Sequence, residues 1–549
     1  MWRLVRRFLA VPAALIVCAL IARVAFPIRY WPLCDLTLLA ILAIHFARIP
    51  HRRAAQNMLI GLYSILLGLA AAEGLALVVG PAPPTPLSLA TAHLDDISRA
   101  AGVSRNWFFS DPPPLANRHA PPQEWMKLTR DFVEPPQFVQ PGFRSADLFK
   151  AWNVVYIGDP CKNPLLRNAP GRLYVYRPID GAPFPRFRFL PDATTPLGLV
   201  TNQLGWRGPP AQLERPRNLV RIVFVGASTT VNSHFYPYSY PEFVGHWLDL
   251  WGEARNPGIR FEVLNAGREG MNSTDIEAIV RNEVMPLHPD LVVYYEGANQ
   301  FDLKSLLPNG APVQASSMAD PTEREGAVLR TLSAVVNEFA FARLIEAAVE
   351  HFGSSRAEGE WPKPHYGLAR SSLLDEPHPD IRQRNLPLNL PTILGDLDRM
   401  RADAAAGGSE VALSSFVWLV HDGMVLDPAR DKMLLDFLNI TQFPLRYHDI
   451  ARAAAFQNRV FAKYAAKHGL AFFDVARQYP KDPGLFTDAV HMTYSGVRLH
   501  AWIVLQELVP FIEKRLATGQ WPRPPPVDSG PPPEPSYAPT EIAFDCKGG

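Results

Sequence analysis

The sequence predicts an α/β fold, a parallel sheet covered by helices on both faces, preceded by a helical membrane region. From Arg221 onward, apolar β-branched runs alternate with helical stretches, which is the pattern of a parallel sheet. Long apolar runs with basic flanks lie before residue 80. The 549 residues are 48% hydrophobic and 19% charged, which fits a folded chain with a bilayer portion.

The N-terminal region contains three apolar runs, Phe8–Phe26, Leu33–Ala47 and Met58–Val79. The third has the ~20 residues that a spanning helix needs, whereas the second is shorter and carries Asp35 and His45. A cleaved signal peptide would not continue through the second and third runs. We therefore expect three transmembrane helices.

Basic residues predict the orientation of these helices. The positive-inside rule places basic flanks in the cytoplasm, so the N-terminus and the second loop are expected there, and everything after residue 80 in the periplasm of a Gram-negative bacterium. The basic flanks are Arg3, Arg6 and Arg7 before the first run, and Arg48, Arg52 and Arg53 after the second; the loop between those runs holds only Arg29.

Proline marks the linkers, because it fixes φ and cannot donate a backbone hydrogen bond. The 55 prolines are about twice the usual ~5% share. With 54 basic and 53 acidic residues, the chain offers no excess charge for nucleic acid. We expect a transmembrane region at 1–80, a Pro-rich linker and N-terminal extension at 81–219, the α/β domain at 220–518 with an insertion at 301–409, and a Pro-rich tail at 519–549.

The chain has four cysteines. Cys18 and Cys34 lie in or beside the predicted membrane helices. Cys161 and Cys546 fall in the exported part, where an oxidising compartment would allow a disulfide between them, tying the tail to the segment before the α/β domain. No CxxC, HExxH or Cys/His cluster has zinc-site spacing, so a metal site is not expected.

The elements of the α/β domain follow from periodicity and local composition. In a parallel sheet, ligands bind at the carboxyl ends of the strands. We expect strands at Arg221–Val225, Arg260–Leu264, Leu291–Tyr295, Glu410–Val420 and Leu470–Val475. We expect helices at Thr274–Val284, Ala327–His351, Ile393–Ala405, Tyr447–His468 and Ser495–Leu516.

Ser228 follows the first predicted strand through Gly226 and Ala227, and the next helix is expected to begin near Thr229. A serine hydroxyl becomes a nucleophile when a base removes its proton. The alternative is a helix cap, a position that serine favours. On its own the cap is the better reading, and the motifs that follow reverse that preference.

Gly270 and Asn299 follow the second and third predicted strands, in the blocks Asn265–Gly270 and Gly297–Asn299. A glycine N–H approaches a substrate closely, and an asparagine side chain supplies another donor. Acyl transfer needs such donors for its oxyanion, each worth roughly 2.7 to 4 kcal/mol. A turn and a turn cap are the alternatives for the two residues taken singly.

Asp488 and His491 lie between a strand-like run and the last predicted helix. Histidine can take the serine proton and return it to the leaving group, while aspartate holds the imidazole tautomer. A second D-x-x-H copy, Asp375 and His378, lies in a Pro-flanked stretch with no strand before it. We favour the later pair.

These blocks, in this order, resemble the SGNH, or GDSL-type, hydrolase superfamily, over about residues 220 to 516. The resemblance implies a flavodoxin-like fold with Ser228 as nucleophile, His491 as base and Asp488 as its orienting partner. It also implies an oxyanion hole formed by the Ser228 N–H, the Gly270 N–H and the Asn299 side chain. No cofactor is implied.

Two further features concern this resemblance. Ala227 stands where the family usually has aspartate, which alters local hydrogen bonding without removing the nucleophile. The segment Thr201–Gly208 resembles the lead-in of membrane-anchored bacterial relatives. Asn202 and Arg207 within it could contact substrate, although a structural turn is the better reading.

The resulting hypothesis is a membrane-anchored, exported serine esterase that cleaves acyl esters, O-acetyl esters in particular, on cell-envelope glycans. The glycan is inferred from location alone. An O-acyltransferase of an envelope polysaccharide would use the same triad, and a lipid esterase or thioesterase also remains open. The alternative of another class is a non-catalytic glycan-binding subunit on a decayed hydrolase fold.

Overall fold

A computed structural model describes residues 30–47, 53–79, 86–120, 172–178, 236–308, 366–426, 431–524 and 537–543, parts of 12–21 and parts of 184–232, with short gaps at 369–370 and 383. The predicted helix Ala327–His351, most of the Pro-rich linkers, and both Cys161 and Cys546 lie outside the described residues. Two compact units result, one containing the N-terminal helices and the other beginning at Thr85. Each is described by itself.

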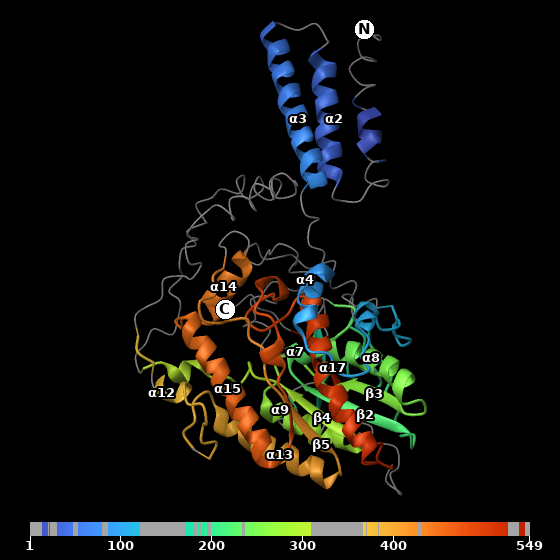
Figure 1. Ribbon diagram of the computed structural model, residues 1–549, viewed down its shortest axis with the longest axis vertical. Coiled ribbons are helices and arrows are strands. Elements are labelled where there is room, and N and C mark those ends of the chain that lie inside the picture. Colours follow the sequence, from blue (N-terminus) through green and yellow to red (C-terminus); the bar gives the residue numbers. More distant parts are fainter. Residues whose placement is uncertain are drawn as a thin grey trace. The chain divides into compact units, whose positions relative to one another are not determined.

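The N-terminal unit contains two apolar helices, α2 (Trp31–Ala47) and α3 (Arg53–Val79), which pack against each other (Figure 1). Within the first predicted helix, residues 14–19 are helical. In the described part of the chain, one helical stretch, Ala55–Leu75, is long and apolar enough to cross a membrane, and α2 is apolar but shorter.

A five-stranded parallel sheet forms the centre of the second unit, and the predicted sheet flanked by helices is confirmed. Its strands lie in the order β3-β2-β4-β5-β6. Numbered along the chain, this is the 2-1-3-4-5 order of flavodoxin-like folds, in which strand order reverses between the first and third strands. Their bounds are β2 (Leu219–Gly226), β3 (Arg260–Asn265), β4 (Leu291–Tyr295), β5 (Glu410–Ser414) and β6 (Ala471–Phe473).

Helices cover the sheet on both faces, so the central strands β2 and β4 are buried throughout. α8 (Tyr240–Arg255) packs on α17 (Tyr494–Ala517) and on β3, whereas α13 (Leu390–Ala406) packs on β5 and on α9 (Ser273–Ile279) (Figure 1). α15 (Tyr447–His468) has the predicted bounds and packs on β5 and β6.

Several elements differ from the sequence prediction, and α14 (Lys432–Thr441), β1 (Arg172–Pro178) and β7 (Tyr537–Ala543) were not predicted. The strand expected at Glu410–Val420 ends at Ser414, because the following apolar residues form a buried loop. The helix expected at Thr274–Val284 is α-helical only to Ile279 and continues as a π-helical turn. α8 was not predicted.

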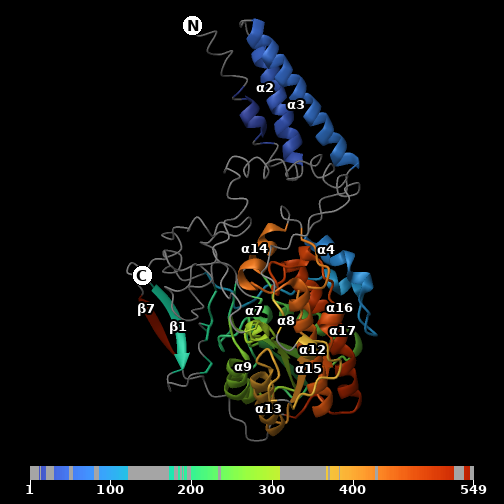
Figure 2. The ribbon, with the colours of Figure 1, turned by 90° about the vertical axis from the view of Figure 1, so that its left-hand side faces the viewer.

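A separate antiparallel ribbon joins β1 (Arg172–Pro178) to β7 (Tyr537–Ala543) (Figure 2). Arg172 pairs with Ala543 and Pro178 with Tyr537. The chain that precedes β1 and the chain that follows β7 therefore leave the same end of the ribbon.

The remaining described elements are short. They are α4 (Pro86–Ala92), α7 (Ser228–Val231), α12 (Ser371–Leu374), α14 (Lys432–Thr441), α16 (Val475–Gln478) and the helical turns η2 (Leu94–Asp96), η3 (Arg105–Phe109), η6 (Val280–Val284), η7 (Met285–Leu287), η8 (Leu303–Leu306) and η10 (Pro483–Leu485).

Candidate active site

Ser228 lies at the point where strand order reverses. β2 ends at Gly226, and the single-turn helix α7 runs from Ser228 to Val231 and is followed by Asn232, whose φ of 45° is left-handed. The Thr230 hydroxyl donates to the carbonyl of Tyr295, the last residue of the neighbouring strand β4, at 3.0 Å. The Ser228 turn is thereby fixed to the carboxyl end of β4, beside the crevice where such sheets bind ligands.

His491 lies between Ser228 and Asp488. Its Nε2 is 2.7 Å from Ser228 Oγ, and its Nδ1 is 2.6 Å from Asp488 Oδ2. The backbone N–H groups of Val490 and His491 both donate to Asp488 Oδ1 at 2.8 Å. These hydrogen bonds hold the Asp488 side chain against the turn that follows it. Thr487 N–H donates to the His491 carbonyl at 2.8 Å and completes this turn.

Neighbouring carboxylates set the protonation of His491. Burial lowers its pKa, but Asp488, with further contributions from Glu269 and Glu296, raises the pKa to about 9. The imidazole remains 41% exposed, so solvent screens part of this effect. Burial raises the pKa of Asp488, and the charge and hydrogen bond of His491 more than offset it, leaving that pKa lowered. The pair therefore favours a carboxylate beside an imidazolium.

The loop that carries Gly270 is fastened to the Ser228 turn. Asn265, the last residue of β3, donates from Nδ2 to the Thr230 carbonyl at 3.0 Å and accepts from Gly267 N–H at 3.0 Å. Gly270 has φ of 64°, a left-handed conformation that glycine adopts without steric cost. A side chain at this position would strain the loop, which explains the glycine independently of any contact to substrate.

Asn299 lies in the loop after β4, and its side chain already has a structural partner. Its Nδ2 donates to the Met271 carbonyl at 2.9 Å, which joins this loop to the one that carries Gly270. One hydrogen of the amide nitrogen is engaged in this way, and the second is the one that could meet an oxyanion.

Glu296 is a residue of this site that the sequence analysis missed. It directly follows β4, is 2% exposed, and accepts the N–H groups of Ala298 at 2.8 Å and Asn299 at 2.7 Å. Burial raises its pKa to about 7, against the lowering effect of these N–H donors and of His491. A carboxylate that immediately follows a fully apolar strand was the available sequence signal.

Arg207 has a structural role in the segment Thr201–Gly208. It donates to Glu242 Oε2 at 2.9 Å and to the carbonyls of Asn232 at 2.9 Å and Tyr236 at 2.7 Å. Arg207 thus binds the connection between α7 and α8 at two points, Asn232 and Tyr236.

The same connection also reaches the turn that carries His491. Tyr236 donates from its hydroxyl to the Met492 carbonyl at 2.9 Å, next to His491. Asn202 likewise serves the turn, since its Oδ1 accepts the N–H groups of Leu204 and Trp206.

The second D-x-x-H copy forms no comparable pair. Asp375 binds Arg452 through two hydrogen bonds, at 2.8 and 2.5 Å. The backbone N–H of His378 donates to Glu376 at 3.0 Å. Asp375 is therefore engaged in a surface ion pair.

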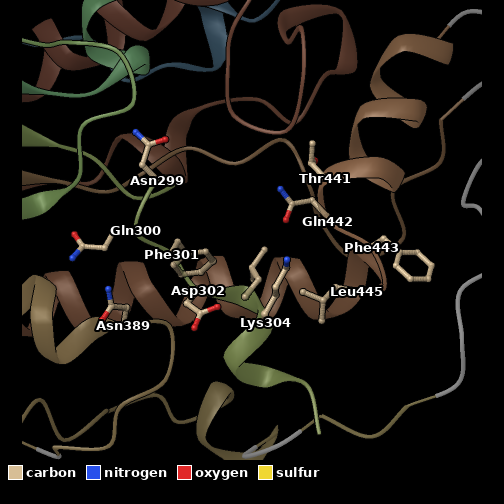
Figure 3. Close-up of a pocket in the computed structure, with 11 residues that line it drawn as sticks. Asn299, Gln300, Phe301, Asp302, Lys304, Asn389, Thr441, Gln442, Phe443 and Leu445 are labelled. Atoms are coloured by element: carbon tan, nitrogen blue, oxygen red, sulfur yellow. The ribbon is translucent and has the colours of Figure 1, made fainter. Parts of the chain in front are cut away.

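A cavity of about 480 Å³ adjoins the site on the Asn299 side (Figure 3). It is lined by the loop from Asn299 to Lys304, by Asn389 immediately before α13, and by Thr441, Gln442, Phe443 and Leu445 at and after the end of α14. Its volume is within the ~300–1,000 Å³ of small-molecule sites.

No protein-family model and no curated protein matches the chain. Solved structures match about half of it. A GDSL-like lipase from Bacteroides thetaiotaomicron VPI-5482 is 17% identical with a TM-score of 0.25, and the match covers 54% of this chain and 88% of that one. An acetylxylan esterase from Geobacillus stearothermophilus is 14% identical with a TM-score of 0.28, covering 53% and 96%. Likenesses this distant assign no role to any residue of this chain.

Proposed function

We propose that this chain is a serine ester hydrolase of the SGNH type that cleaves acyl esters, O-acetyl esters in particular. The observation that carries the proposal is the placement of His491 within hydrogen-bond distance of both Ser228 and Asp488. This is the arrangement that nucleophilic acyl transfer needs. A non-catalytic glycan-binding subunit would have no chemical need for it.

Catalysis proceeds in two halves. His491 takes the Ser228 proton as the serine oxygen attacks the ester carbonyl, and Asp488 stabilises the imidazolium that forms. The tetrahedral intermediate collapses, the C–O bond to the alcohol breaks, and the alcohol leaves with the proton from His491. Water, activated by the same histidine, then attacks the acyl-Ser228 ester and releases a carboxylic acid.

The oxyanion of both tetrahedral intermediates is assigned to the Ser228 N–H, the Gly270 N–H and the Asn299 side chain. The links between the three loops that carry these residues support this assignment, because they fix the donors before substrate arrives. Preorganised donors need no rearrangement as charge develops. No cofactor is required.

The chain is proposed to be anchored in a bacterial inner membrane by its N-terminal helices, with the catalytic unit in the periplasm. The apolar surface of α3 supports the anchoring: Met58 is 71% exposed, Ile65 62% and Leu75 65%. Such a surface needs an apolar environment. The proposed substrates are acylated glycans of the cell envelope, with transfer of the acyl group to a sugar hydroxyl as the alternative to hydrolysis.

Turnover of p-nitrophenyl acetate by the full chain in detergent micelles tests the proposal. Ser228→Ala and His491→Ala are expected to reduce turnover to background in folded protein. His378→Ala is the matched control, since His378 belongs to the second D-x-x-H copy, and it should retain the wild-type rate. Wild-type rates in Ser228→Ala would contradict the assignment of the nucleophile.

A further inference from the structure

The cavity beside Asn299 is built from residues with fixed positions. Gln300 Oε1 accepts the Ser273 N–H at 2.8 Å. Phe301 is 7% exposed and packs on Trp418, with ring centroids 5.3 Å apart. The residue before Asn389 is tied to the same loop, because Ser305 Oγ accepts the Leu388 N–H at 3.1 Å. The cavity is therefore pre-formed, as small-molecule sites usually are.

The lining of this cavity is rich in hydrogen-bonding side chains. Gln442 contributes an amide, which both donates and accepts, and Lys304 contributes an ammonium group. The oxygens of Gln300 and Asn389 already accept from Ser273 and Thr392, so these two amides offer their N–H groups. In Figure 3, Gln442 and Lys304 point into the space between the two walls. The Phe301 ring is part of the lining and contributes an apolar surface.

These features match one class of ligand. An acyl chain or a lipid tail would leave the amides and the ammonium group without water and without partners, which is unfavourable. A sugar presents hydroxyl groups that donate and accept, and a C–H face that packs on an aromatic ring. The lining therefore favours a saccharide over a lipid or an acyl chain.

We propose that this cavity is a saccharide subsite, which binds the sugar that carries the ester cleaved at Ser228. The proposal rests on the proposed function and selects the glycan substrate over the lipid and thioester alternatives. Asn299 lines the cavity and is also joined to the loop of Gly270 through Met271. A sugar in the cavity therefore lies beside Asn299, one of the proposed oxyanion donors, and the oxygen of its esterified hydroxyl is the leaving group that takes the proton from His491.

Calorimetric titration of the full-length Ser228→Ala protein tests the subsite without turnover. The probes are O-acetylated oligosaccharides with xylose, uronate and N-acetylglucosamine backbones. At least one should bind, and adding Gln442→Ala or Asn389→Ala should raise its Kd about fivefold or more, the effect of a lost hydrogen bond. Gln520→Ala is the matched control, because Gln520 is exposed outside the cavity, and should leave Kd unchanged.

Two results would overturn the subsite. One is that none of the three backbones binds; the other is binding whose Kd is the same with and without the Gln442 and Asn389 substitutions. Failure of the proposed function has a different signature, namely absent turnover of p-nitrophenyl acetate by the wild-type chain. If a lysolipid binds while the sugars do not, and the same substitutions raise its Kd, the cavity is assigned to a lipid instead.

Discussion

Glu296 is expected to act on catalysis in two separable ways, through its shape and through its charge. Glu296→Ala removes the acceptor of the Ala298 and Asn299 N–H groups. Each buried donor left unpaired costs about 1–3 kcal/mol, so the two together cost about 2–6 kcal/mol. Asn299 is exposed, so water can hydrogen-bond its N–H in the variant. The cost is therefore expected near the lower end of this range, about 2 kcal/mol. If the loop that positions Asn299 bears this cost, kcat/KM falls on the order of 30-fold or more.

Glu296→Gln separates the two effects, since its amide oxygen can still accept both N–H groups while the charge is gone. Catalysis needs neutral His491, whose pKa is raised to about 9 with Glu296 contributing. In wild type, kcat/KM is therefore expected to rise as pH increases through this range. Removing the carboxylate lowers the pKa of His491 and moves this rise to lower pH.

The assay is the pH profile of kcat/KM for p-nitrophenyl acetate between pH 5 and about 10, the range that spans the titration of histidine. Glu513→Gln, a change at a surface carboxylate, is the matched control and should leave the profile in place. Equal losses of activity in folded Glu296→Ala and Glu296→Gln would refute the acceptor role. A profile of Glu296→Gln that coincides with wild type would refute the electrostatic role.

Three other predictions concern the triad, the Arg207 contacts and the tail. Asp488→Asn should lower kcat by about 10³-fold or more and lower the pKa of His491; steady-state kinetics that match wild type would contradict the pairing. Arg207→Ala should destabilise the catalytic unit by about 3–5 kcal/mol, because Glu242 keeps a buried charge, and an unchanged urea midpoint would exclude this. Cys161 and Cys546 should form a disulfide in protein isolated from the periplasmic side; four titratable thiols without reductant, where two are expected, would argue against it.

The sequence predicted the five strands of the sheet because an apolar, β-branched strand pattern is a local signal. β5 was predicted too long for a physical reason. Phe416 N–H donates to Asn458 at 2.8 Å and Leu419 N–H to the Ala489 carbonyl at 2.9 Å, so this apolar stretch is a loop buried beneath the His491 turn. A buried loop and a buried strand have the same apolar composition.

The missed helix α8 had a recognisable start. Ser239 and Glu242 form a capping box, and Pro241 lies in the first turn, which are start signals visible in the sequence. Gly245 and Gly252 lower helix propensity and obscured it. The interior of α8 is stabilised instead by tertiary packing, with Trp247 stacked on Phe243 at 5.3 Å.

The candidate site likewise contains contacts that the sequence could predict and contacts that it could not. Asp488 and His491 are three residues apart, so one turn suffices to pair them. The bond from Asn299 to Met271 and the bond from Arg207 to Tyr236 depend on how distant loops meet at the edge of the sheet. Such contacts follow from the topology of the sheet, and the spacing of residues along the chain does not predict them.

The β1–β7 ribbon has a consequence for biogenesis. Its strands come from distant parts of the chain, so β1 can pair only after Tyr537 has been synthesised. Contacts between such distant residues form late, since a long loop must close first. Until then the unpaired N–H and C=O groups of β1 are open to other strands. Resistance of β1 to added protease would thus report that β7 has been made and has joined it.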